Sequence, residues 1–213
     1  MKQQNKMNFN NEMKYYMQQG LYSMAALMIS GTVLQTFLLE CKISAEALSF
    51  YTSFMQVVQM VIMILCSKKL EHLKNIIFTT AVMQMMQITI LLILLLFCFT
   101  NNISVNTKFY SIFFVGILVN IGQGVYNVIC YKLPYHIMDM KRYGIVMGVS
   151  GTITGVIGIL FSAILTIFLK RLPYFNVMSI FLLAGIIGLA SAVCITLKYR
   201  DNGFVGTDTS EKK

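Results

Sequence analysis

Long apolar stretches alternate with short polar connectors along the chain. Six of the stretches are long enough to cross a bilayer core of roughly 30 Å, which needs about 20 residues of α-helix. Because the connectors are short, neighbouring helices are expected to run antiparallel. We predict an all-α membrane protein with six transmembrane helices, over residues 17–39, 47–66, 75–99, 109–131, 145–169 and 175–197.

Polar sequence flanks this predicted bundle at both ends. Residues 1–16 lack the short apolar core and small-residue cleavage site of a secretory signal, so we expect a cytoplasmic N-terminal segment that is not processed. Residues 198–213 form a polar cytoplasmic tail whose composition is typical of disorder. Residues 17–197 between them make up the transmembrane bundle.

Composition agrees with the membrane interpretation. The 213 residues are 57% hydrophobic and 12% charged, whereas soluble domains carry about 25% charged residues. The formal charge of +9 does not indicate a nucleic-acid partner, because the basic residues lie between apolar runs rather than along one soluble face. The expected partner is the lipid bilayer, and the expected location is the cell membrane, as a multi-pass protein.

The distribution of lysine and arginine predicts the orientation. If the N-terminus is inside, the outer side holds four of the 17 basic residues, Lys42, Lys108, Lys170 and Arg171, and the inner side holds the rest. Inner loops of membrane proteins carry the excess of Lys and Arg. Both termini are therefore expected in the cytoplasm.

Amide side chains interrupt the apolar spans. In the fourth span Asn120, Gln123 and Asn127 follow an i, i+3, i+7 spacing, which places them on one helix face. Such a face avoids hydrocarbon and marks either a helix contact or a water-filled pathway.

Other spans carry amides at a similar depth. The second span aligns Gln56 and Gln59 with Thr52, the third aligns Gln84 and Gln87 with Thr80, and the first holds Gln35 in its outer half. A single amide is typically a helix-to-helix hydrogen bond. For the whole set we favour a polar cavity near the membrane midplane, because membrane helices rarely need so many polar partners at one depth.

The fifth span is rich in glycine. Its glycines include two GxxxG pairs, which are typical of closely packed membrane helices. A helix that slides or bends would favour the same smooth surface. We assign helix packing to Gly144, Gly148, Gly151, Gly155 and Gly158.

No pattern indicates catalysis or a bound metal. The five cysteines are scattered singly without a CxxC motif, and they are interpreted as small core residues. His72 and His136 lie in or near predicted inner connectors, and no Ser/His/acid or metal-ligand set can be assembled at one depth. We expect no enzyme activity and no cofactor.

Three local patterns resemble the N-terminal six-helix half of a major facilitator superfamily transporter, and the resemblance covers Tyr15 to Tyr199. The first is GLYSMAALMISGTVLQTFLLE followed by ISAEALSFYTSFMQ, which is similar to the family's first two helices and outer turn. The second is the inner loop between the second and third spans, where the family has the pattern Gly-x-x-x-Asp-Arg-x-Gly-basic. Here Ser67 takes the place of the Gly, Glu71 that of the acid and His72 that of the Arg, and Lys74 and Asn75 take the last two positions, so the match is degenerate. The third is Asn120-Ile-Gly-Gln123-Gly124, where many members have Arg-x-x-Gln-Gly.

The resemblance implies two inverted three-helix repeats, a mid-membrane substrate cavity and alternating access. It implies that spans one, two, four and five line the cavity and that Glu71, His72 and Lys74 belong to a loop that latches one conformation. The cavity residues are then Gln35, Gln56, Gln59, Asn120, Gln123 and Asn127, ranked above Gln84 and Gln87. Without a fixed charge, such a site suits an uncharged or hydroxyl-rich solute. Asn120 in place of the arginine argues against proton coupling there, and the fifth helix lacks the proline of the antiporter signature.

The family's transporters have twelve spans, so this chain alone is expected to move no solute. The expected partner is a C-terminal six-helix half or a second copy. Two alternatives remain open. One is the substrate-binding membrane subunit of an energy-coupling-factor vitamin transporter, in which Ala26 and Ser30 would approximate an Ala-x-x-x-Ala contact; the other is a non-transporting membrane scaffold.

Overall fold

All regular structure in the described part of the chain is helical. The computed structural model describes residues 2–29, 31–67, 75–100, 103–138 and 140–199. Their elements are α1 (Lys2–Ile29), α2 (Gly31–Glu40), α3 (Ala45–Ser67), α4 (Ile76–Phe99), α5 (Val105–Cys130), α6 (Leu133–Ile137), the 3₁₀ turn η2 (Met140–Arg142), α7 (Tyr143–Leu169) and α8 (Tyr174–Leu197).

Six helices are long and apolar enough to cross a membrane, as the hydrophobic pattern predicts. They are Asn10–Glu40, which comprises most of α1 together with α2, and the five long helices α3, α4, α5, α7 and α8. The protein is therefore consistent with a multi-pass membrane protein. Helix boundaries differ from the sequence prediction by a few residues, except in the first span.

The first span differs from the prediction at its start. The helix begins at Lys2, inside the segment predicted to precede the bundle, and the apolar spanning stretch runs from Asn10 to Glu40. Asn11, Glu12 and Lys14 in this early part of the span contact other parts of the bundle, as described below.

Local signals explain several helix ends. The side-chain oxygen of Ser104 accepts a hydrogen bond from the Thr107 amide at 3.2 Å and caps α5. At the end of α2, Lys42 adopts a positive φ of 66°, and the Ile43 amide donates to the Leu38 carbonyl at 3.2 Å. A left-handed residue followed by this bond closes a helix C-terminus, so the chain reverses directly into α3.

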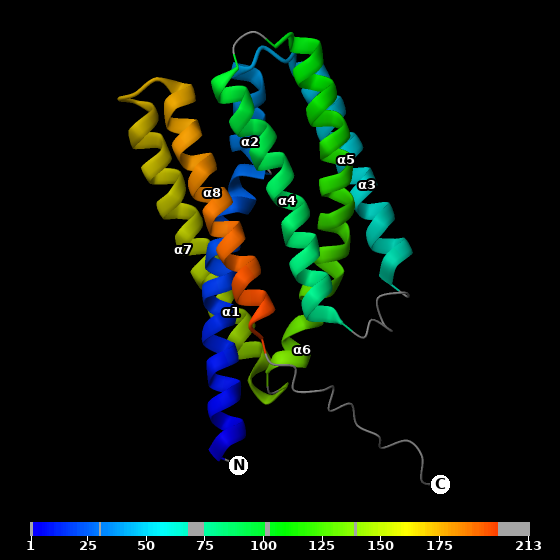
Figure 1. The fold of residues 1–213 in the computed structure, drawn as a ribbon, viewed down its shortest axis with the longest axis vertical. Coiled ribbons are helices and arrows are strands. Elements are labelled where there is room, and N and C mark those ends of the chain that lie inside the picture. The colour runs from blue at the N-terminus through cyan, green and yellow to red at the C-terminus, as the bar shows by residue number, and fades with distance from the viewer. Residues whose placement is uncertain (1, 30, 68–74, 101–102, 139, 200–213) are drawn as a thin grey trace.

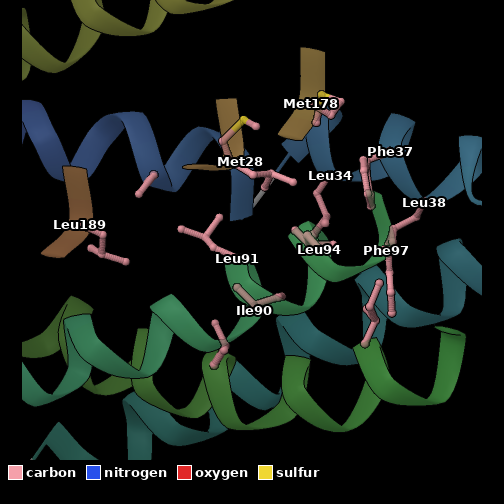
Figure 2. Packing of buried hydrophobic residues seen from close by; sticks show 14 of the residues in the cluster. Met28, Leu34, Phe37, Leu38, Ile90, Leu91, Leu94, Phe97, Met178 and Leu189 are labelled. Carbon is pink, nitrogen blue, oxygen red and sulfur yellow. The ribbon is translucent and has the colours of Figure 1, made fainter. Parts of the chain in front are cut away.

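The bundle is built around α4, which packs on both α5 and α8 (Figure 1). On one side α1 packs on α8 and on α7, and on the other α3 packs on α5. Figure 2 shows the core between these helices, where Phe37 and Leu38 of α2 and Met28 of α1 meet Leu91 and Leu94 of α4.

Two helices at the edges of the bundle are sparsely covered. Of α3 only Leu48, Tyr51 and Met55 are buried. Of α7 only four residues are buried: Val146, Ser150, Phe161 and Leu165. Both helices therefore present most of their surface to whatever surrounds the chain.

A second buried cluster lies at the end of the bundle where, in Figure 1, α1 begins and α8 ends. Tyr15 of α1 and Tyr199 after α8 join residues of α5, α6 and α7 there, including Leu133, Ile137 and Val146. Lys198 and Tyr199, the first two residues of the predicted tail, are thus part of the folded bundle. Residues 200–213 lie outside the described residues.

Candidate functional site

Three polar side chains meet in the interior, from α1, α4 and α5. The Tyr22 hydroxyl donates to Gln123 Oε1 at 3.0 Å. Gln87 Nε2 donates to the Tyr22 hydroxyl oxygen at 3.0 Å and also to Gln123 Oε1. Gln123 Nε2 donates in turn to Asn127 Oδ1 at 3.0 Å. We call Tyr22, Gln87, Gln123 and Asn127 the amide cluster.

The amide cluster grades from a buried to an accessible end. Gln87 has no exposed surface and Tyr22 is buried, while Gln123 and Asn127 are half-buried. The Tyr22 ring stacks on that of Tyr126, with centroids 4.7 Å apart, and so holds its hydroxyl toward α4 and α5. Gln123 and Asn127 are therefore the more accessible members, and Tyr22 and Gln87 hold Gln123 by hydrogen bonds from the buried side.

Hydrogen-bonding capacity remains unused at the buried end. Gln87 Oε1 is buried and has no hydrogen-bond partner among the described residues. The neighbouring Gln84 is also fully buried; its Oε1 accepts from the Thr196 hydroxyl of α8 at 3.0 Å, and its Nε2 is unpartnered within the described chain. An unpaired buried polar atom is costly, so this region of the core is only partly satisfied.

Asn120 lies on the same side of α5 as Gln123 and Asn127, as the spacing predicts, and is half-buried. Its side-chain Nδ2 donates to the Gly116 carbonyl oxygen of its own helix at 2.8 Å. The structure therefore does not place Asn120 inside the amide cluster.

The candidate residues of α3 lie on one side of that helix. Phe54 stacks on Phe113 of α5, with centroids 5.3 Å apart. Gln56 follows Phe54 by two residues, or about 200° of helix rotation, so it projects away from this aromatic contact. Gln56 is exposed and Gln59 half-buried, and neither is among the hydrogen-bonded members of the amide cluster. Gln35 is half-buried on α2.

The hydrogen bonds agree only in part with the order in which the resemblance ranks the candidate cavity residues. Gln123 and Asn127 belong to the amide cluster, but so does Gln87, which the resemblance ranked lower. Glu71, His72 and Lys74, the candidates for a conformational loop, lie outside the described residues.

Sequence reasoning missed Tyr22 because a tyrosine inside an apolar run carries no signal of its own. It also missed a polar cluster at the end of the bundle that carries the termini. There Arg142 Nη1 lies 3.0 Å from Glu12 Oε2, and the Glu12 side chain is only 3% exposed. The sequence separates these two residues by four predicted spans.

Further bonds at this end fasten α1 to the rest of the chain. Asn11 Nδ2 donates to the Ile137 carbonyl at 2.9 Å, and Lys14 Nζ donates to the Lys198 carbonyl at 2.9 Å. The Tyr199 hydroxyl donates to Gln18 Oε1 at 3.3 Å, and burial raises the pKa of the Tyr199 phenol. The polar residues Asn11, Lys14 and Gln18 thus make this part of α1 a structural element of the bundle.

Four of the five α7 glycines pack against nothing in the described part of the chain. A methyl group built at Gly144, Gly148, Gly151 or Gly155 would have no atom of the described structure within 4 Å, and at Gly158 it would just reach Leu27 at 4.0 Å. The face that these glycines form points away from α1. Close packing of this face stays a prediction. No described residue of the chain covers the face, so the packing surface would have to come from elsewhere.

The amide cluster offers neutral donors and acceptors, which suits the binding of hydroxyl or amide groups. Among the described residues, no group of three or more His, Cys, Asp or Glu side chains is placed to hold a metal ion. Comparison with known proteins found no matching family model, no matching curated protein and no matching solved structure.

Proposed function

We propose that this chain is a six-helix bundle of a secondary transporter of the major facilitator type, which moves a small uncharged solute across the cell membrane by alternating access. The observation that carries the proposal is a regularity in the helix contacts. The first three spans correspond in order to the last three, α1 to α5, α3 to α7 and α4 to α8. Under this correspondence the α1–α7 contact matches the α5–α3 contact, the α1–α8 contact matches the α5–α4 contact, and the α4–α8 contact matches itself, and all of these contacts are present.

The direction of the helices supports inverted repeats. In Figure 1, α1 starts at the end of the bundle where the termini lie, whereas α5 starts at the opposite end. Two similar triplets that run in opposite directions are typical of secondary transporters, in which solute sites lie near the midplane at the interface between repeats. The amide cluster joins α1 and α5, the first helices of the two triplets, through Tyr22 and Gln123.

The proposed solute wall is the half-buried side of α5 together with the nearby side of α3. Asn120, Gln123 and Asn127 would contact the solute, and Gln59, which is half-buried on α3, would extend the wall. Because these side chains are neutral, the proposed solute is recognised by hydrogen bonds to hydroxyl or amide groups rather than by charge. The resemblance in sequence points to the same residues.

A single bundle has one open side, so the proposal includes a second six-helix bundle. The sparsely covered helices α3 and α7 are the surfaces that would meet it, and both lie at the edges of the bundle. The glycine face of α7 would permit close approach of another helix. The second bundle is either a C-terminal half or another copy of this chain.

The proposal is tested with the purified chain and a library of uncharged polyols, sugars and amides. A solute that binds the folded state raises the apparent stability by about 2.7 kcal/mol at a hundredfold excess over its Kd, which a thermal-unfolding assay in detergent detects. Asn120→Leu is expected to abolish this shift. Phe114→Leu, on the exposed side of α5, is the matched control and is expected to retain it.

Transport is then measured in proteoliposomes. The chain alone is expected to give no uptake, and co-reconstitution with its second bundle is expected to restore it. Tight solute binding without uptake in either preparation would favour a substrate-binding subunit. A shift that persists in Asn120→Leu would mean that Asn120 does not contact the solute, and a chain that shows no shift with any solute would mean that the amides only join helices.

A further inference from the structure

An apolar groove runs along the outer side of α1 and α7. It has a volume of about 380 Å³ and is lined by Met17, Leu21 and Met24 of α1 and by Ile153 and Ile157 of α7. Gly20 forms its floor, since a methyl group built there would lie 2.9 Å from Ile157 Cδ1. The residues of α1 span about 12 Å of helix, from Tyr16 to Met24.

The groove opens away from the bundle. Gly20 and Met24 each lie two residues from Tyr22, which is about 200° around the helix. Because Tyr22 points into the interior and bonds to Gln87 and Gln123, the groove faces the opposite direction. In a membrane-spanning helix that direction is lipid, so hydrocarbon chains are the molecules that meet this surface.

Cationic residues lie near one end of the groove in the fold. Tyr16, its last lining residue, lies one turn from Glu12, whose carboxylate pairs with Arg142 at 3.0 Å. The Arg142 side chain is 50% exposed, and Lys141 beside it is exposed. On the α8 side of the groove, Lys14 contacts the Lys198 carbonyl at 2.9 Å. Among the described residues named here, three carry a positive charge and only Glu12 carries a negative one.

We propose that this groove is a binding site for an anionic phospholipid. One acyl chain lies along Gly20 between α1 and α7, and the phosphate lies at the end of the groove near Lys14, Lys141 and Arg142. An apolar channel accepts the hydrocarbon, and clustered Lys and Arg at a membrane surface attract anionic headgroups. The site is independent of the proposed transport function, because it lies on the side of α1 opposite the amide cluster.

The test is native mass spectrometry of the full chain in mild detergent, titrated with phosphatidylglycerol or with phosphatidylcholine of the same acyl chains. We expect phosphatidylglycerol to bind with higher occupancy. Gly20→Leu fills the groove floor and should lower the occupancy of both lipids. Gly148→Leu makes the same substitution on the open face of α7 and should leave both unchanged.

Charge variants test the headgroup half of the site without touching the core. Lys14→Gln combined with Lys141→Gln should weaken phosphatidylglycerol binding by about fivefold for each charge removed, since one Lys or Arg near an anionic surface contributes an attraction of that size. Phosphatidylcholine binding should not change. The control is Lys170→Gln with Arg171→Gln, which removes two charges at the opposite end of α7.

Equal binding of the two lipids by the unaltered chain would overturn the proposal. Equal loss of phosphatidylglycerol in the two pairs of charge variants would also overturn it, because the attraction would then belong to the whole molecule. If Gly20→Leu does not elute as a folded monomer in size exclusion, the charge variants decide the question alone, since their residues do not line the groove.

Discussion

The two glutamines joined in the amide cluster are expected to respond in opposite ways to the same substitution. Gln87→Leu removes two hydrogen bonds that Gln87 Nε2 donates, to Tyr22 and to Gln123. At about 0.6 kcal/mol each for side-chain hydrogen bonds in membrane proteins, their loss costs about 1.2 kcal/mol. The substitution also removes the buried, unpartnered Gln87 Oε1, whose burial costs about 1 to 3 kcal/mol.

The balance for Gln87→Leu is therefore close to zero or favourable. After the change, the Tyr22 hydroxyl still donates to Gln123 Oε1 at 3.0 Å, so no new donor is left without a partner by this change. We expect the free energy of unfolding to stay the same or to rise by up to about 2 kcal/mol.

Gln123→Leu removes an acceptor as well as a donor. The two bonds to Gln123 Oε1 and the bond from Gln123 Nε2 to Asn127 are lost, and the buried Tyr22 hydroxyl no longer has the acceptor for its proton. The three lost bonds cost about 1.8 kcal/mol, and the stranded donor adds about 1 to 3 kcal/mol, so we expect a loss of about 3 to 5 kcal/mol.

Reversible unfolding in mixed micelles, followed by circular dichroism, measures both values. A double-mutant cycle with the two Gln→Leu variants isolates their coupling, which is expected at about 0.6 kcal/mol and no more than about 1.7 kcal/mol. The reasoning is refuted if Gln87→Leu destabilises the protein as much as Gln123→Leu, since Gln87 Oε1 would then have a partner such as a bound water.

Three further predictions concern other parts of the bundle. Arg142→Gln is expected to lower the free energy of unfolding by about 3 to 5 kcal/mol in chemical denaturation, because it leaves the buried Glu12 carboxylate unpaired. Glu12→Gln should lower it less, since it leaves only the half-exposed Arg142 unpaired. Equal losses in the two variants would contradict this expectation. Gly124→Ala should lower the free energy of unfolding by about 1 to 3 kcal/mol, because its methyl group would lie 3.0 Å from the Gln59 carbonyl oxygen. The methyl group of Gly148→Ala meets no described atom within 4 Å, so this variant should not lower it. A loss of stability in Gly148→Ala alone would contradict the close contact between α5 and α3. In a cysteine-free background, Asn106→Cys should react with a membrane-impermeant maleimide on intact cells and Lys198→Cys only after permeabilisation, as the positive-inside rule predicts; the reverse pattern would invert the orientation.

The six long helices could be predicted from the sequence because their signal is local. About 20 consecutive apolar residues require a helix in a membrane, since every backbone group must bond within its own segment. The shared side of Asn120, Gln123 and Asn127 followed from spacing alone, for the same reason. Neither inference needs to know which helix lies next to which.

The partners of the polar side chains could not be predicted, because they depend on how each helix is rotated against its neighbours. Gln123 bonds to Gln87 and Tyr22, which lie 36 and 101 residues away in the chain. The same limit explains the early turns of α1. Asn11, Glu12 and Lys14 looked like a solvated terminus, and only their contacts to α6, η2 and the end of α8 make them part of the fold.

Glycines mark the places where two pairs of helices approach closely. In α5, methyl groups built at Gly116 and Gly124 would lie 2.6 Å from the Tyr51 hydroxyl oxygen and 3.0 Å from the Gln59 carbonyl oxygen, so both glycines permit the approach of α3. In α1, Gly20 permits the approach of α7 in the same way. In each triplet the first helix therefore supplies the small residue for its contact with the second helix of the other triplet. The α7 glycines are not needed for that contact, which leaves their face available for the second bundle that the proposed function requires.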